Sequence, residues 1–417
     1  MDLKRIKIGV DGETVDLSTI REFNLDYIDN VNSKSRHIPA IKQDSYGNYK
    51  YNFVGYVFSK NKILAVFPKN YIPVYEYSNI TQFDLTLLSS VLIKYNRYYL
   101  SNNKSQDDNF ESTFPFTAYY GIFDYFIKYG IYSANKSVVV GNSNGKILWK
   151  DTIQKSNQYI SNGNIIFSPL YTKKNNNYEN FVSECMKFVI HYTSTQYGFI
   201  ISKTHYFKDV LNFDFILHRD YVINELNKAK LNSFKDIHKQ LIDNLIDFFR
   251  SIKLAGQGLF RHYKFNHVWE DMVGHYLNNY FQQVDNNHGV IFNAHKEPLA
   301  RKFSKIGFTP GIGSNNQYIN LYPDHYLQLG DNQYIFDSKY YSKIDNLDHK
   351  QMVYFMLLRH RSNQTFNALF IPTFKSTYNE LHIKLFDEFN LGKGESDKLV
   401  IWNTYLNVIS VMKNYIE

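Results

Sequence analysis

The apolar residues of this chain change their spacing once, and the change separates two kinds of secondary structure. Before a polar break at residues 173–180 (KKNNNYEN), short apolar runs alternate with clusters of Gly, Asn and Ser, which is typical of β-strands. After the break, apolar residues recur every three or four positions, which predicts helices. The 417 residues exceed one ordinary hydrophobic core, so we expect two or three domains.

Residues 1–172 are predicted to form a mostly β module that binds a partner or DNA. Two helices are expected inside it, near residues 85–99 and 119–129. The segments that predict strands are NYKYNFVGYVFS, NKILAVFP, SVVVGN and GKILWK.

Residues 173–256 are predicted to form a helical connector, because helical spacing covers residues 181–192 and 233–254. From residue 257 to residue 417 the pattern is helix, strands, helix, strand and helix, which indicates an α/β domain. The expected fold class is therefore α+β or α/β with several domains.

Charge and cysteine content restrict the partners and the compartment. The formal net charge is +8 and the pI is near 9.0, which suits a polyanion such as nucleic acid, although Lys-rich coding gives the same excess. The lone cysteine, Cys185, is expected to be a buried core thiol, and a chain without internal disulfides fits a reducing cytoplasm. No apolar run has the length of a membrane span or a signal core, so we expect a cytoplasmic protein without a membrane anchor.

Residues 322–341 (YPDHYLQLGDNQYIFDSKYY) predict a β-hairpin around a Gly-Asp-Asn turn. A two-residue loop at Gly-Asp places Asp324 opposite Asp337, and one at Asp-Asn places it opposite Lys339. Both put the three side chains on one face, because strand side chains alternate. A three-residue loop would put Asp324 on the other face.

Carboxylates that share a face repel each other and therefore favour a bound cation. Mg²⁺ prefers oxygen ligands and keeps several waters, which suits Asp324 and Asp337 with a substrate phosphate, and Mn²⁺ can take its place. Such an ion polarises a phosphate and lowers the pKa of a bound water. Lys339 would position that water and offset developing charge. The alternative is an ordinary charged hairpin, since D-x-K is common by chance.

The helices predicted before and after the hairpin each contribute a candidate residue. Residues 265–281 predict an amphipathic helix with Glu270 at the border of its apolar face, either supporting the metal or the water or simply solvated. Residues 348–358 predict a helix capped by Asp348, whose N-terminus favours a nearby phosphate. Gln351 would orient the phosphate or the water there, or be part of a polar first turn.

Other segments contain residue types that bind phosphate in many proteins. SVVVGNSNGKI (residues 137–147) resembles a P-loop, but it has three residues between its glycines, Ile147 after the lysine, and a predicted strand next, so a hairpin turn is favoured. The chain is therefore expected to lack an NTPase site. Basic residues that could contact DNA phosphates or be solvated are Arg261, Lys264, Arg301, Lys302 and Lys305.

The order of these elements resembles the PD-(D/E)XK nuclease superfamily. The matching positions are Glu270, Asp324, Asp337, Lys339 and Gln351. Tyr354 follows the glutamine at Q-x-x-Y spacing, one residue shorter than in several members. The segments FNHVWEDMVGHYLN and YPDHYLQLGDNQYIFDSKYY, with NGKILWKDTIQ upstream, are similar to LlaJI-family restriction endonucleases and the related McrC subunits.

The resemblance implies a C-terminal PD-(D/E)XK core, a mixed sheet flanked by helices, with Asp324, Asp337 and Glu270 as metal ligands. It implies a Mg²⁺-dependent endonuclease subunit of a restriction system that cuts double-stranded DNA with a separate McrB-like GTPase. Two alternatives stay open. One is a stand-alone type II enzyme that dimerises on DNA without a nucleotide, and the other is a non-catalytic DNA-binding or assembly subunit with a structural acidic cluster.

Overall fold

The structure is a computed structural model that describes residues 5–25, 38–59, 62–103, 109–142, 144–252, 258–312, 318–342, 349–390, 392, 394 and 398–417. The chain divides into two compact units. Unit 1 comprises Met1–Phe114, Phe199–Ser202 and Ala255–Glu417, and unit 2 comprises Pro115–Gly198 and Lys203–Leu254. This grouping differs from the predicted boundaries after residues 172 and 256, because a helix before residue 173 packs with the helices after it.

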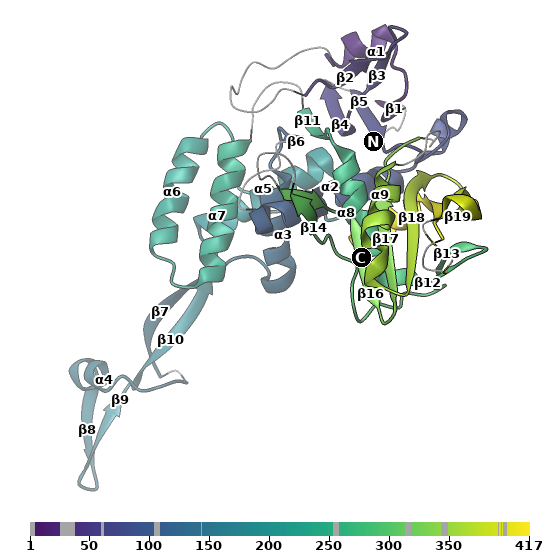
Figure 1. Ribbon diagram of the computed structural model, residues 1–417. Helices are drawn as coiled ribbons and strands as arrows, with labels where there is room; N and C mark the ends of the chain where they lie inside the picture. Colours follow the sequence, from purple (N-terminus) through teal and green to yellow (C-terminus); the bar gives the residue numbers. More distant parts are fainter. Residues whose placement is uncertain are drawn as a thin grey trace. The chain divides into compact units, whose positions relative to one another are not determined.

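A five-stranded sheet in unit 1 joins segments from the beginning and the middle of the chain (Figure 1). Its order is β1-β5-β4-β11-β6, with β1 and β5 parallel and β4 antiparallel to β5 and β11. The strands are β1 Ile6–Val10, β4 Val54–Ser59, β5 Lys62–Phe67, β6 Phe110–Ser112 and β11 Gly258–His262. Further elements of this region are α1 Leu17–Glu22, β2 Ile41–Gln43, β3 Tyr49–Tyr51, the 3-10 helix η2 Val74–Asn79, and α2 Gln82–Asn103. The strands predicted from NYKYNFVGYVFS and NKILAVFP are confirmed.

Unit 2 is a helical bundle with a β arm (Figure 1). The bundle consists of α3 Phe116–Tyr129, α5 Phe181–Tyr197, α6 Arg219–Leu231 and α7 Asp236–Ser251, and α3 packs against α5 and α7. The helices predicted near residues 119–129, 181–192 and 233–254 are confirmed. Cys185 is buried in α5, as predicted.

The β arm corrects two local predictions. Its long ribbon pairs β7 Ala134–Gly141 with β10 Tyr171–Tyr178, so the predicted polar break at 173–180 mostly continues a strand. GKILWK is not a strand, because only Ile147 forms an isolated bridge before α4 begins at Trp149. The remaining elements are α4 Trp149–Lys155 and the hairpin of β8 Asn157–Ser161 and β9 Asn164–Ser168.

A second five-stranded sheet forms the C-terminal part of unit 1, with the order β16-β17-β18-β20-β19. The three central strands are parallel and the two edge strands are antiparallel to their neighbours. The strands are β16 His325–Leu329, β17 Asn332–Ser338, β18 Gln364–Thr373, β19 Tyr378–Lys384 and β20 Val400–Asn407. The helices are α8 Phe265–Tyr280, α9 His349–Leu358 and α10 Val408–Ile416, with 3-10 turns η4 Arg359–Arg361 and η5 Asp387–Phe389. Two ribbons pair β12 Phe281–Asp285 with β13 Gly289–Phe292, and β14 Phe308–Ile312 with β15 Tyr318–Leu321.

Helices cover both faces of this sheet. On one face, Ile335 of β17 packs in a cluster with Tyr354 and Leu358 of α9. On the other face, the indole nitrogen of Trp269 in α8 donates to the Phe370 carbonyl of β18 at 3.2 Å. Because strand side chains alternate, Asp337 lies on the same face as Ile335, under α9. The expected mixed α/β class is confirmed. Within the described ranges, no helix combines the length and apolarity needed to cross a membrane.

Candidate active site

The hairpin of β16 and β17 adopts the first of the two predicted registers. Its paired residues leave a two-residue loop of Gly330 and Asp331, and Gly330 has the positive φ of +56° that such a tight loop requires. Continuing the pairing by one position beyond the first residue of β16 puts Asp324 opposite Asp337. The two carboxylates therefore lie at the same end and on the same face of the hairpin.

Asp337 is a buried carboxylate held between two lysines. Its side chain is 2% exposed, with Lys339 Nζ at 2.5 Å from Oδ2 and Lys350 Nζ at 2.9 Å from Oδ1. Burial raises the pKa of Asp337, but the two ammonium groups outweigh burial and hold the pKa below its usual range. Asp337 is therefore ionised at neutral pH.

Asp324 has a different environment and a different charge state. Its Oδ2 accepts a hydrogen bond from the Ser338 backbone N–H at 3.0 Å, and its side chain is 11% exposed. Burial, followed by the negative charges of Asp337 and Glu270, raises the pKa of Asp324 to about 7. Near neutral pH this group is therefore poised between its protonated and ionised forms.

Glu270 reaches the site from α8 through a lysine. Lys305 Nζ lies 2.7 Å from Glu270 Oε1 and 3.8 Å from Asp324 Oδ1. Burial lowers the pKa of Lys305, but the hydrogen bond to Glu270 and the negative charges of Glu270 and Asp324 together outweigh burial, and the pKa is raised. Lys305 thus belongs to the site, where the sequence suggested only a flanking phosphate contact or a solvated residue.

Gln351 lies in the first turn of α9 and is 1% exposed. Its amide nitrogen donates to the Ile335 carbonyl and to Asn367 Oδ1, the latter at 3.1 Å. These bonds tie its amide nitrogen to the sheet beside the carboxylates. The predicted helix cap Asp348 lies outside the described residues. Lys350, the residue before Gln351, contacts Asp337. The sequence reasoning did not assign this role to Lys350, and the available signal was its place in the first turn of the helix that follows the D-x-K strand.

The donor set suits a hard cation that retains part of its water shell. Among the residues that the structure describes, no group of three or more His, Cys, Asp and Glu side chains is gathered closely enough to hold a metal. Mg²⁺ is usually bound through one or two carboxylates with water and substrate phosphate, which matches Asp324 and Asp337. The mutual charge repulsion that raises the pKa of Asp324 is what a cation would relieve.

One of the predicted phosphate contacts is wrong. Arg261 is buried in β11, where its Nε lies 2.8 Å from Glu111 Oε2 and its guanidinium lies over the rings of Phe53 and Tyr263. These partners hold its charge inside the first sheet. Arg301 and Lys302 are exposed, so they remain candidates for contact with phosphate.

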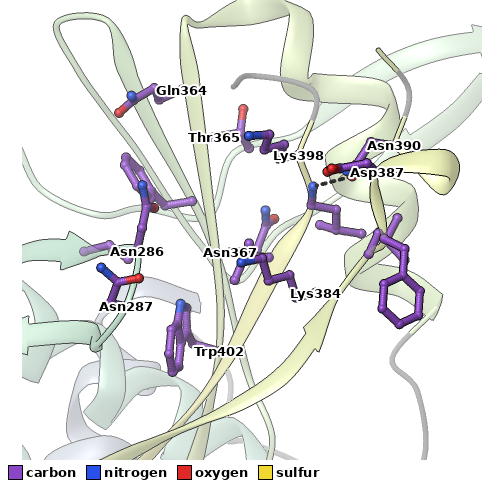
Figure 2. Close-up of a pocket in the computed structure, with 16 residues that line it drawn as sticks. Asn286, Asn287, Gln364, Thr365, Asn367, Lys384, Asp387, Asn390, Lys398 and Trp402 are labelled. Atoms are coloured by element: carbon purple, nitrogen blue, oxygen red, sulfur yellow. Dashed lines mark hydrogen bonds between the residues drawn. The ribbon is translucent and has the colours of Figure 1, made fainter. Parts of the chain in front are cut away.

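A pocket of about 680 Å³ lies away from the carboxylates, where β18 and β20 begin (Figure 2). Gln364, one of its lining residues, pairs with Asn332 at the start of β17, whereas Asp337 is near the end of that strand. Five residues of strand separate these two positions, but another lining residue, Asn367, pairs with Ile335 and accepts a hydrogen bond from Gln351. The carboxylates and lysines of the site are not among the residues that line the pocket.

Fold and site together define a mixed α/β protein with a buried cluster of carboxylates and lysines at the end of a hairpin. A family model described as LlaJI restriction endonuclease matches residues 53–354, most of the chain, and the chain belongs to this family. The matched range includes every predicted site residue from Glu270 to Gln351.

Comparison with solved structures gives weaker likenesses. A chain of a refined half-complex from a tetradecameric assembly of Thermococcus gammatolerans McrB AAA+ hexamers with bound McrC has 13% identity and a TM-score of 0.41, covering 99% of this chain and 98% of that chain. A chain of the cryo-EM structure of the Thermococcus gammatolerans McrBC complex has 11% identity and a TM-score of 0.19, covering 60% of this chain and 71% of that chain. Both scores are too low to establish a common fold. No curated protein sequence matches the chain.

Proposed function

We propose that this chain is the cleavage subunit of a restriction system and hydrolyses phosphodiester bonds of double-stranded DNA with Mg²⁺ or Mn²⁺. The observation that carries the proposal is the opposition of Asp324 and Asp337 at the end of one hairpin, with Lys339 on the second carboxylate. Membership of the LlaJI restriction endonuclease family supports it. The sheet between α8 and α9 would be a PD-(D/E)XK core.

Asp324 and Asp337 would hold the metal ion, with Glu270 supporting it from α8. The bound ion would polarise a phosphate and lower the pKa of a water. Asp337 is already ionised, because Lys339 and Lys350 stabilise its negative charge. Asp324 would lose its proton when a cation balances the neighbouring carboxylates, so metal binding would release a proton from this residue.

Lys339 would act on the water and on the charge that develops on the phosphate. Its ammonium lies at Asp337 Oδ2 and its side chain is 14% exposed, so it is held beside a carboxylate that is proposed to bind the metal. An ammonium in such a shielded site stabilises negative charge more strongly than one in water. Gln351 is proposed to act through the sheet, by fixing α9 and Lys350 against β17.

An McrB-like GTPase is proposed as the partner, on the resemblance of the hairpin and α8 segments to McrC subunits. Under this proposal the excess of basic residues serves DNA binding. A stand-alone enzyme that dimerises on DNA is the alternative within the same chemistry. Dependence of cleavage on GTP and on the partner distinguishes the two.

A non-catalytic DNA-binding or assembly subunit is the second candidate, and one observation favours it. Lys305, Lys339 and Lys350 already neutralise the three carboxylates without any ion. Such a cluster can be purely structural. This candidate requires that the site bind neither Mg²⁺ nor Mn²⁺.

Plasmid nicking tests the proposal, with the partner GTPase present and with Mg²⁺ and GTP each added or withheld. Asp337→Ala and Lys339→Ala should abolish cleavage, while Asp331→Asn in the exposed turn of the same hairpin should leave it unchanged. Titration calorimetry with Mn²⁺ on the same proteins reports the metal site directly. Retained cleavage in both site variants, or wild-type protein that neither cuts nor binds metal, would overturn the proposal.

A further inference from the structure

The residue after Lys339 is held by the first sheet of unit 1. Tyr340 is 7% exposed, and its ring lies against Phe265 at the start of α8. Its hydroxyl accepts a hydrogen bond from the Lys69 backbone N–H at 2.9 Å and interacts with the carboxylate of Asp11. Asp11 follows β1 and Lys69 follows β5, so two loops of the first sheet contact the side chain of Tyr340, which follows β17 of the second sheet.

Asn70 adds two bonds to the backbone next to Tyr340. Its amide nitrogen donates to the Ser342 carbonyl at 3.1 Å and to the Pro372 carbonyl at 2.9 Å. Pro372 belongs to β18, so one side chain joins the strand beside β17 to the segment that leaves β17. Asn70 has a φ of +57°, a conformation in which asparagine is among the most favoured residues after glycine.

The loop that carries these groups is itself firmly anchored. Tyr71 is 1% exposed, its ring lies 4.6 Å from that of Phe67, and its hydroxyl donates to Asp84 Oδ1 at 2.6 Å. Asp84 is in the first turn of α2. The loop therefore has the support of both β5 and α2, and it is a rigid surface rather than a free turn.

The second sheet by itself gives the segment after Asp337 little support. β17 ends at Ser338, and the last backbone bond that follows its pairing with β18 runs from the Lys339 N–H to the Phe370 carbonyl at 2.9 Å. Among the described residues that follow this bond, Tyr340 and Ser342 make the contacts with the loop after β5. Lys339, whose ammonium contacts Asp337, makes the last bond to the sheet and directly precedes these contacts.

We propose that Asp11, Lys69 and Asn70 are positioning residues for Lys339, so that the first sheet is a structural part of the active site. The catalytic consequence rests on the proposed function, whereas the ordering of the segment does not. A displacement of the order of 1 Å in a catalytic group is enough to lower a rate substantially, which explains why such a grip matters. The predicted N-terminal module thus acquires a role within the site in addition to any partner or DNA it binds.

Asn70→Asp is the sharpest test, because it keeps the size of the side chain and replaces the donor with a carboxylate facing two carbonyls. Asn162→Asp is the matched control, since Asn162 has a similar φ of +47° and lies in the turn between β8 and β9. Tyr340→Phe, which keeps the ring on Phe265 and removes only the hydroxyl, is the second variant. All three proteins are full-length.

Hydrogen exchange of the amides of Lys339, Tyr340 and Ser342 is measured first, since it does not depend on activity. Asn70→Asp should speed their exchange by about tenfold or more, with a smaller effect for Tyr340→Phe and none for the control. Amides in the centre of β18 should keep their protection in every variant, which shows that the fold is intact. Unchanged exchange at residues 339–342 in Asn70→Asp overturns the proposal, whether or not the wild-type protein cuts DNA.

Cleavage kinetics test the catalytic consequence of the proposal. In Asn70→Asp the rate at saturating DNA should fall by about tenfold while the dissociation constant for DNA stays within about twofold, the pattern expected when transition-state interactions alone are lost. Faster exchange with an unchanged rate would overturn the positioning role. If wild-type protein fails to cut or to bind Mn²⁺, the proposed function fails, and the exchange result alone decides whether the first sheet orders Lys339.

Discussion

Asp324 and Asp337 face each other across one hairpin, yet their pKa values are displaced in opposite directions. Burial and the neighbouring carboxylates raise the pKa of Asp324 to about 7, and its ammonium neighbour Lys305 is 3.8 Å away. The pKa of Asp337 is lowered, because the two lysines that contact it outweigh its burial. Opposite displacement of two neighbouring acids is common at sites that bind metal or transfer protons.

The raised pKa of Asp324 predicts a dependence of stability on pH. The folded protein binds this proton more tightly than the unfolded chain, whose Asp pKa is about 3.9, so the contribution is fully stabilising below about pH 4 and is lost as the pH rises through 7. Asp324→Asn should therefore have a higher melting temperature than metal-free wild type at pH 8. The difference should shrink towards pH 4. Calorimetry across this range measures it, with Asp331→Asn as the control, and a difference that is constant with pH would contradict the assignment.

Removing Lys350 should change the acid limb of the cleavage profile. Lys350→Met takes one of two cations from Asp337, so the pKa of that carboxylate should rise and more of it should be protonated in mildly acidic solution. We expect the activity of Lys350→Met relative to wild type to fall as the pH is lowered and to recover at higher pH, since each unit by which a pKa rises moves the protonation transition by one pH unit. Single-turnover rates against pH test this, with Lys228→Met, which removes an exposed lysine paired with Glu225 in α6, as the reference protein. Equal loss at every pH would show that Lys350 acts in some way other than on the charge of Asp337.

Divalent metal should stabilise the protein through Asp324 and Asp337. A ligand that binds only the folded state stabilises it by RT ln(1 + [L]/Kd), so the melting temperature rises with the ligand concentration. Mg²⁺ or Mn²⁺ should therefore raise the melting temperature of wild type, and chelation should reverse the change. Asp337→Ala should respond to neither treatment. A shift of equal size in Asp337→Ala would place the responsible metal elsewhere.

Gln351 distinguishes support of the sheet from contact with DNA. Replacement by leucine leaves the Ile335 carbonyl and Asn367 without their donor inside the fold. Such a loss should cost about 1–3 kcal/mol of unfolding free energy. Denaturant unfolding measures this cost. Unchanged stability combined with lost cleavage would instead support the predicted role of Gln351 in orienting the phosphate.

The local sequence pattern was sufficient to predict the β16–β17 hairpin and the helix that carries Glu270. Strand alternation limited Asp324, Asp337 and Lys339 to one face for either two-residue loop, and helical spacing located α8 around Glu270. The choice between the two registers needed the structure, because Gly-Asp and Asp-Asn are both acceptable turn pairs.

Long-range packing was beyond the reach of local pattern. Nothing near Arg261 in the sequence indicates that its partner is Glu111, and nothing near Lys305 indicates Glu270. The composition of GKILWK is typical of a strand, but Ile147 forms only an isolated bridge with Thr172 before α4 begins at Trp149. In each case the deciding contact comes from residues remote in the sequence or from a neighbouring element.

The position of β11 has a consequence for the growing chain. This strand lies between β4 and β6, and β6 pairs with no other strand in the described part of the first sheet. During synthesis, β4 and β6 cannot pair with β11 until residues 258–262 have emerged, which happens after all of unit 2. Until then β4 has an open edge, the kind of surface that invites wrong strand pairing. A ribosome has to translate all of unit 2 before the first sheet can close.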